Sequence, residues 1–173
     1  MPKIIAAVTE ISVCICVLWL ISFLSALLHE LGHAVGYMLA TGNRHWHIRV
    51  GWGKKLLETK TLTVKLLTLD GNFDPAENRI DSKAKLIAAL SGGPAVSLIL
   101  AAALSYLKFG GVSYDSGIIA SNSIEALITI ALFCNVFIFV SSVIPARYFF
   151  GEIKGTETDG LKIINAIKDR EAP

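Results

Sequence analysis

Three long apolar segments constrain this chain more than any other feature of its sequence. They cover residues of about 11–39, 86–107 and 118–144, and each reaches the roughly 20 residues that a helix needs to cross a bilayer. Apolar residues make up 53% of the 173 positions, which exceeds the roughly 45–50% of a soluble domain. We therefore expect a multi-pass membrane protein with an all-α core of three transmembrane helices, folded as a single domain over 1–173.

The charges outside these segments predict how the chain lies in the cell membrane. Lys and Arg gather in the loop 41–85 and in the C-terminal tail, whereas the opposite side carries only Lys3 and Lys108. Cytoplasmic loops of membrane proteins are rich in Lys and Arg. We therefore expect the loop 41–85 and the C-terminus to be cytoplasmic and the N-terminus to lie outside. The net charge of +2 gives no indication of nucleic-acid binding.

The segment 46–71 has a different character. It is rich in Val, Ile, Leu and Thr and alternates in part, which predicts strands, with a turn near 51–54 and a stop at Asp70-Gly71. A polar connector is expected over 72–82. The segment should form a small membrane-associated β-hairpin on the cytoplasmic side, either as a simple link between spans or as an edge strand for a peptide partner.

Small residues at helical spacing predict close contacts between the spans. Gly93 and Ser97 form a small-xxx-small pair in the second span, and Gly32 and Gly36 leave room beside the first. Near the C-terminus, residues of about 159–170 predict a short amphipathic helix because their apolar positions recur on one face.

The first apolar segment runs without a charge from Ile11 to Leu28 and then continues as His29-Glu30-Leu31-Gly32-His33. Residues four apart share one helix face, so the two imidazoles can bind one metal ion while Glu30 stands beside them as a general base. Ionisable residues in a membrane helix are costly and therefore indicate function. We predict one Zn²⁺ site at His29 and His33, inside the membrane and close to the cytoplasm.

A catalytic zinc takes three protein ligands and leaves one open position. The sequence offers several candidates for the third. His45 and His47 follow the end of the first helix, and Glu58 has a spacing that zincins with a Glu ligand use. Asp159 lies on the same membrane side as the histidines, but an aspartate before a helix is also a common N-cap. The residues alone leave this choice open.

The order of motifs along nearly the whole chain resembles the site-2 protease family of intramembrane zinc metalloproteases, in its small, domain-free bacterial form. The motifs are HELGH on a membrane helix, a strand-rich segment with GWGKKL, SGGPAVS in the next span, and Pro145 followed later by Asp159-Gly160. Two departures stand out. Ser142 precedes Pro145 where the family commonly has Asn, and Asp159 follows that proline by 14 positions, a longer gap than usual.

The resemblance implies a role for each of these residues. His29, His33 and Asp159 would bind the zinc, Glu30 would be the general base, and Asn135 would contact the substrate or the developing oxyanion. The hairpin would receive an extended substrate strand.

The resemblance also implies an activity, that of a zinc-dependent metalloendopeptidase, a hydrolase that cleaves a membrane-anchored peptide or protein within or near its transmembrane segment. Its partners would be that substrate and the lipid bilayer, and a regulatory membrane protein or a second copy of the chain is compatible with it. Two rivals remain. One is a membrane gluzincin with Glu58 as third ligand that cuts at the membrane surface, and the other is a metal-binding membrane protein without turnover.

Overall fold

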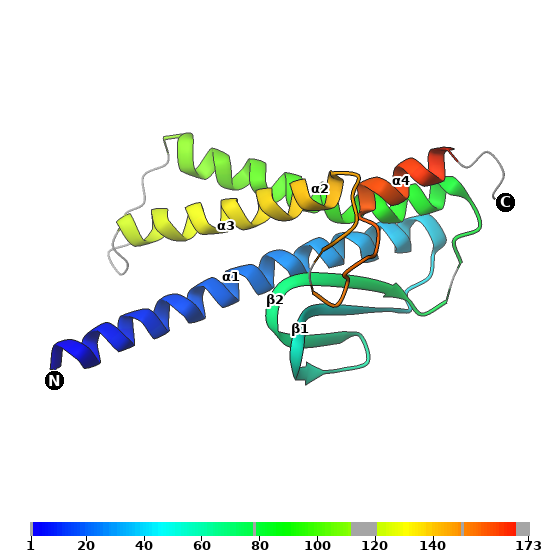
Figure 1. Ribbon diagram of the computed structural model, residues 1–173. Coiled ribbons are helices and arrows are strands. Elements are labelled where there is room, and N and C mark those ends of the chain that lie inside the picture. The colour runs from blue at the N-terminus through cyan, green and yellow to red at the C-terminus, as the bar shows by residue number, and fades with distance from the viewer. Residues whose placement is uncertain (1, 78, 112–120, 150, 169–173) are drawn as a thin grey trace.

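The computed structural model describes the chain except residues 1, 78, 112–120, 150 and 169–173. Its elements follow in the order α1 (Pro2–Thr41), β1 (Trp46–Glu58), β2 (Leu62–Pro75), α2 (Lys83–Phe109), α3 (Ser121–Val143) and α4 (Asp159–Lys168) (Figure 1). Three of these helices, α1, α2 and α3, are long and apolar enough to cross a membrane. The predicted count of three is therefore confirmed. Part of the predicted third span, 118–120, lies outside the described residues.

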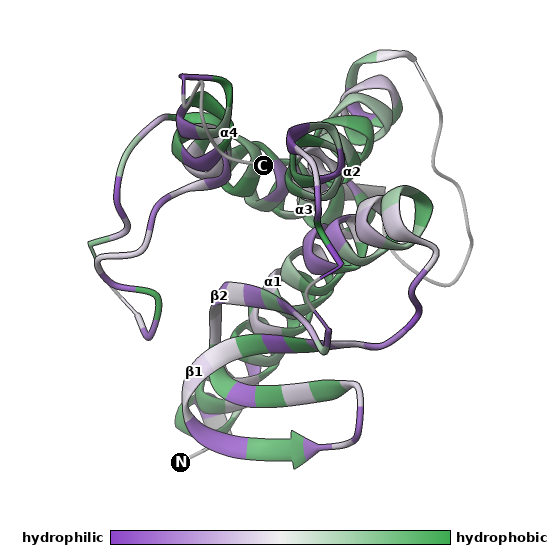
Figure 2. Cartoon of the chain, turned by 90° about the vertical axis from the view of Figure 1, so that its right-hand side faces the viewer, coloured by the Kyte–Doolittle hydropathy of each residue, from purple (hydrophilic) through white to green (hydrophobic). Residues whose placement is uncertain are grey.

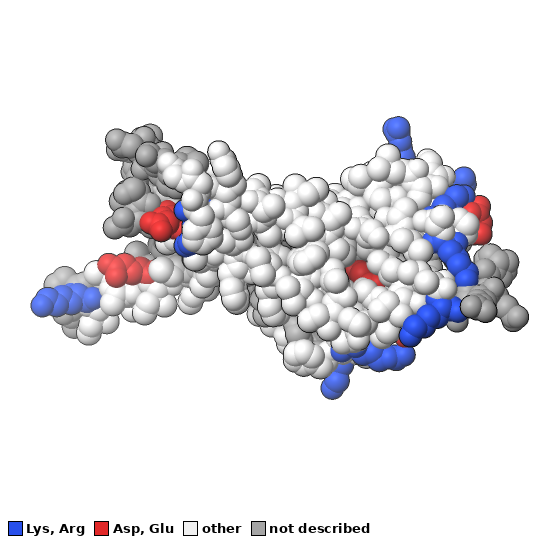
Figure 3. Space-filling model, turned by 90° about the horizontal axis from the view of Figure 1, so that it is seen from above, with Lys and Arg blue, Asp and Glu red and all other residues white. Residues whose placement is uncertain are grey.

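Helix α1 is the centre of the molecule. The strands lie on one side of it and α2 and α3 lie on the other (Figures 1 and 2). Helix α1 contacts both strands and both of these helices, and within the described part of the chain the strands make no comparable contact with α2 or α3. In the view of Figure 3, charged side chains gather toward the two ends of the molecule and leave a mostly uncharged middle. This distribution suits a protein whose middle lies in lipid.

Glycines bring α1 and α2 into close contact, as the small-residue pattern predicts. A Cβ atom on Gly32 would lie 2.8 Å from the carbonyl carbon of Gly92, and one on Gly36 would lie 3.2 Å from the Cα of Ala89. Both distances are shorter than an ordinary contact between carbon atoms. The two helices can therefore pack at this distance only because the contact positions carry no side chain.

The sequence Thr41-Gly42-Asn43 predicts the end of the first helix, because Gly and Asn are common C-cap residues, and this prediction is confirmed. Gly42 adopts a positive φ of 71°, and its amide donates to the carbonyl of Met38 at 2.9 Å, which closes α1 as a left-handed C-cap. The sheet then runs back along α1, where the indole of Trp19 donates to the carbonyl of Leu66 at 2.6 Å. Buried residues of α1 and β1 share a small core: Ala26, Ala34, Ile48 and Val50.

The sheet differs from the predicted hairpin in two places. The chain does not reverse near 51–54, because β1 continues to Glu58, and Gly51 and Gly53 bend it with positive φ values of 86° and 83°. Strand β2 also passes through Asp70-Gly71 and continues to Pro75 instead of giving way to a connector at 72. The antiparallel pairing of Trp46 with Pro75 holds this extension in place.

Candidate metal centre

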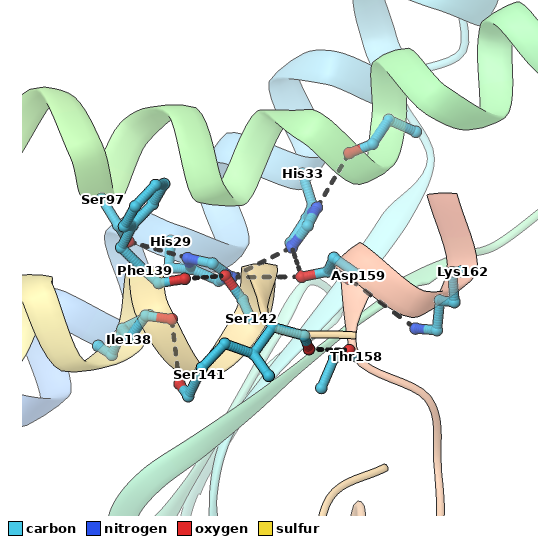
Figure 4. Close-up of polar contacts among 12 residues, drawn as sticks. His29, His33, Ser97, Ile138, Phe139, Ser141, Ser142, Thr158, Asp159 and Lys162 are labelled. Atoms are coloured by element: carbon cyan, nitrogen blue, oxygen red, sulfur yellow. Dashed lines mark hydrogen bonds and ion pairs between the residues drawn. The ribbon is translucent and has the colours of Figure 1, made fainter. Parts of the chain in front are cut away.

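Two histidines of α1 and one aspartate of α4 meet in a buried cluster, which we call the triad (Figure 4). The Nε2 atoms of His29 and His33 are 3.3 Å apart. Oδ2 of Asp159 lies 3.7 Å from the first and 3.3 Å from the second. All three residues are buried, and their ligand atoms lie within 4.8 Å of one another, so the triad can hold a metal ion.

Asp159 reaches the histidines because its neighbour Thr158 takes over the cap of α4. The Thr158 hydroxyl accepts from the amide of Leu161 at 3.3 Å and donates to the carbonyl of Ile144 at 2.8 Å. The first contact caps the helix, and the second ties its start back to the end of α3. The alternative that Asp159 is only an N-cap is therefore wrong, and its carboxylate is free to face His29 and His33.

Two further features bring the start of α4 close to α3. The amide of Thr158 donates to the carbonyl of Ala146 at 3.0 Å, so the chain that leaves α3 after Pro145 returns to its starting point just before Asp159. Gly160 packs against the last turn of α3, where a Cβ atom would lie 2.7 Å from the carbonyl carbon of Val143. In the Asp159-Gly160 pair, the aspartate supplies the carboxylate that faces the histidines, and the glycine lets the start of α4 pack closely against α3.

Both imidazoles are oriented by partners on α2. Nδ1 of His33 lies 2.9 Å from the carbonyl oxygen of Ala89, and Nδ1 of His29 lies 2.9 Å from the hydroxyl oxygen of Ser97. A carbonyl can only accept, so in the neutral His33 ring the proton is on Nδ1 and the lone pair is on Nε2. With the hydroxyl of Ser97 accepting, the same holds for His29. Such outer contacts are typical of metal-binding histidines.

The donor set fits a small tetrahedral cation. Donors about 2.0–2.2 Å from a zinc ion in a tetrahedron lie roughly 3.3–3.6 Å apart, close to the separations of 3.3, 3.3 and 3.7 Å seen here. Burial alone would raise the pKa of the Asp159 carboxyl, but the neighbouring imidazoles of His29 and His33 outweigh this effect and hold its pKa below its usual range. An ionised carboxylate and two lone pairs facing one point match a cation.

Glu30 lies beside the triad and is itself buried. Its carboxylate packs against Gly71 of β2, where any Cβ atom would overlap it. Two cavities meet at Glu30 and His29. One, of about 330 Å³, has mostly apolar walls that come from α3, from the segment that follows it and from Ala26 of α1. The other, of about 250 Å³, also reaches His33, Asp159 and Lys162. We call them the apolar pocket and the polar pocket.

The other candidate ligands lie elsewhere. Glu58 is at the exposed end of β1 and pairs with Lys55 at 2.7 Å. The ring of His47 contacts the carbonyl of Lys60 and the hydroxyl of Thr63 in the sheet, and His45 is exposed. Among the described residues, only His29, His33 and Asp159 form a group that can hold a metal ion.

Asn135 is placed between α3 and α1. Its amide donates to the hydroxyl of Ser25 at 3.1 Å and to the carbonyl of Ala131 at 2.9 Å, while its Oδ1 atom is buried without a hydrogen-bond partner. Ser25 stands one helical turn before His29, but Asn135 is not among the residues that line the two pockets. A role for Asn135 toward the oxyanion stays a prediction.

Sequence reasoning missed several residues that build the site. Ser97 was assigned only to helix packing, although a hydroxyl in an apolar span signals a polar partner. Thr158 carries the common signal of an N-cap directly before the helix, and Gly71 the signal of a close approach in a strand. Their partners His29, Ile144 and Glu30 are far away in the sequence, so no local pattern names them.

The comparisons with known proteins add no relative to this description. No family model, no curated protein and no solved structure matches the chain. Any function must therefore be argued from the site itself.

Proposed function

We propose that this chain is a zinc-dependent intramembrane endopeptidase that cleaves a membrane-anchored peptide or protein. The observation that carries the proposal is the triad of His29, His33 and Asp159 next to a buried Glu30, at the meeting point of two cavities. Two imidazoles and one carboxylate are a known ligand set of catalytic zinc, which keeps a fourth position open. The resemblance to site-2 proteases supports the same assignment.

The chemistry divides between the ion and Glu30. Held by His29, His33 and Asp159, a Zn²⁺ ion would supply Lewis acidity and would lower the pKa of water at the site to about 7. The Glu30 carboxylate takes a proton from the attacking water and returns it to the nitrogen of the leaving amine as the peptide C–N bond breaks. The Ala89 carbonyl keeps the His33 proton on Nδ1, and the Ser97 hydroxyl does the same for His29 when it accepts, so both Nε2 atoms are available to the ion.

The sheet offers a place for an extended substrate. A peptide bond inside a transmembrane helix is shielded, so the substrate must unwind and its freed backbone groups need partners. The stretch 71–75 of β2 borders the polar pocket through Gly71, Asn72, Phe73 and Pro75, and its described strand partner is the start of β1. An unwound substrate that adds a strand beside it would pass Glu30.

The membrane arrangement follows from the charges. We propose the cell membrane as the location, with the loop 41–85 and the C-terminus in the cytoplasm and the N-terminus outside, on the basis of the Lys and Arg distribution. The triad then lies toward the cytoplasmic end of α1, where water has the shortest path to it.

A comparison of membrane peptides in cells that carry the wild type or Glu30→Gln tests the activity. We expect peptides that accumulate uncut in the variant, while the purified variant still binds one zinc per chain. Glu10→Gln is the matched control, because this carboxylate stands on the exposed N-terminal half of the same helix. Equal peptide pools in wild type and Glu30→Gln would favour a metal-binding protein without turnover.

A pair of alanine variants tests the ligand set. Asp159→Ala should lower zinc affinity by more than the roughly 10–100-fold that loss of an outer-shell contact costs, whereas Glu58→Ala should leave it unchanged. Zinc competition with a chelator measures both. If Glu58→Ala loses the metal and Asp159→Ala keeps it, the protein is a gluzincin and the assignment of Asp159 is wrong.

A further inference from the structure

Between α3 and α4, residues 146–149 and 151–158 form a strap that crosses α1 and reaches the sheet (Figure 1). Its base is held by the hydrogen bonds of Thr158 to the carbonyls of Ile144 and Ala146, which we call the Thr158 clamp. At its tip, Lys65 of β2 donates to the Glu152 carboxylate at 2.7 Å, and the Glu152 amide donates to Asp70 at 3.2 Å. Arg49 holds Asp70 from the other side at 3.0 Å. The strap is therefore fixed at both ends.

The middle of the strap stands between the two pockets. Tyr148 and Ile153 line the apolar pocket and the polar pocket alike, as do His29 and Glu30. Backbone hydrogen bonds hold these two residues in place. The amide of Tyr148 donates to the carbonyl of Thr156 at 3.0 Å, and the amide of Thr156 donates to the carbonyl of Ile153 at 3.0 Å. Burial raises the pKa of the Tyr148 hydroxyl, in keeping with its position in a wall.

The two pockets differ in chemistry. Most of the wall of the apolar pocket is apolar and includes Ala26, Phe137, Ile138, Val140 and Ile144, although Asp70, Ser141, Ser142 and Arg147 also line it. The polar pocket holds Asp159 and Lys162. The apolar pocket has a volume of about 330 Å³, which is at the low end of the range of about 300 to 1,000 Å³ for ligand sites. It therefore has room for a bulky side chain but not for a whole helix.

We propose that Tyr148 and Ile153 are specificity-determining residues, and that the strap makes the site select peptides with a bulky apolar side chain next to the scissile bond. That side chain enters the apolar pocket, while the chain on the other side of the bond passes through the polar pocket. The inference rests on the proposed function, because it takes the peptide bond to lie at Glu30. The contact of Glu152 with Lys65 keeps the dividing wall in place.

A panel of membrane peptides that differ only in the residues flanking the cut tests the proposal. With Ala, Leu, Phe or Trp at those positions, the wild type should cleave the Leu or Phe peptide at least about 10-fold faster, in kcat/KM, than the Ala peptide. The larger side chain of Ile153→Trp would fill the apolar pocket, so this variant should cleave the Ala peptide faster than the Leu or Phe peptide. Glu152→Gln loosens the wall and should reduce the ratio while cleavage of the Ala peptide persists. Ile167→Ala, on an exposed face of α4, is the control and should match the wild type.

Binding without turnover gives a second measurement. In the Glu30→Gln background, a photoreactive residue at position 153 should cross-link to the Leu peptide, and the same residue at position 167 should not. Zinc content equal to that of the parent protein confirms that each variant is folded. If the wild type cleaves the panel but Ile153→Trp and Glu152→Gln leave its order unchanged, or if position 153 gives no cross-link, the strap does not set specificity. If the wild type cleaves no peptide while position 153 cross-links, the proposed function fails and the binding inference stands.

Discussion

The two halves of α1 are equally helical and similarly apolar, yet their surroundings are opposite. Every described side chain from Lys3 to Cys16 is exposed in the isolated chain, whereas Ser25, Ala26, Ala34 and Tyr37 are buried together with the two histidines of the triad. In the C-terminal half, α2 supplies hydrogen-bond partners and the sheet covers the helix. Among the described residues nothing covers the N-terminal half in this way, which suits a segment whose valines, isoleucines and leucines face lipid.

The difference shows where a membrane helix can carry polar groups. His29 and His33 tolerate their position because Ser97, Ala89 and Asp159 satisfy their ring nitrogens. No described protein group stands ready to do this beside the exposed half. The comparison therefore yields opposite expectations for similar substitutions in the two halves.

The largest effect is expected from a charge in the exposed half. Leu18 is 47% exposed and lies near the middle of the apolar run. Leu18→Arg should make insertion of the first segment less favourable by about 2.5–3.5 kcal/mol, because nothing there pairs the guanidinium in lipid. Glycosylation mapping in microsomes measures the inserted fraction, with Leu18→Met as control. An inserted fraction equal to that of the wild type would mean that this half faces water, where such a change is worth about 0.5 kcal/mol or less.

A smaller effect is expected from added volume in the packed half. A Cβ atom on Gly32 would lie 2.8 Å from the Gly92 carbonyl carbon and 2.9 Å from Cγ2 of Val96, so Gly32→Ala must push α1 and α2 apart. Overpacking of this kind costs about 1–3 kcal/mol, and the thermal midpoint in detergent should fall. Ala7→Val adds more atoms in the exposed half and should leave the midpoint unchanged. Equal midpoints for Gly32→Ala and the wild type would contradict the close contact.

The same contrast explains what could be predicted from the sequence. The three spans, the shared face of His29 and His33 and the Gly42 cap depend on local spacing and were confirmed. The predicted turn near 51–54 was wrong because β1 stays paired with β2 beyond it, Trp52 with Leu67 and Glu58 with Thr63. Asp159 as a partner of the histidines needed the family resemblance, since the Thr158 clamp that returns it to α3 joins residues 14 apart.

The smallest effect tests whether a hydroxyl of α2 acts on the metal site. The Ser97 hydroxyl is fully buried against Nδ1 of His29. Ser97→Ala should lower zinc affinity about 10–100-fold, as loss of such an outer contact does elsewhere, and Ser97→Thr should restore most of it because the hydroxyl returns. The matched control is Ser12→Ala, whose hydroxyl bonds only to the carbonyl of Val8 within α1. Chelator competition separates a positioning role from packing, because a residue that only packs would change the thermal midpoint of the zinc-free protein and not its zinc affinity. Wild-type affinity in Ser97→Ala would mean that His29 is oriented by α1 and Asp159 alone.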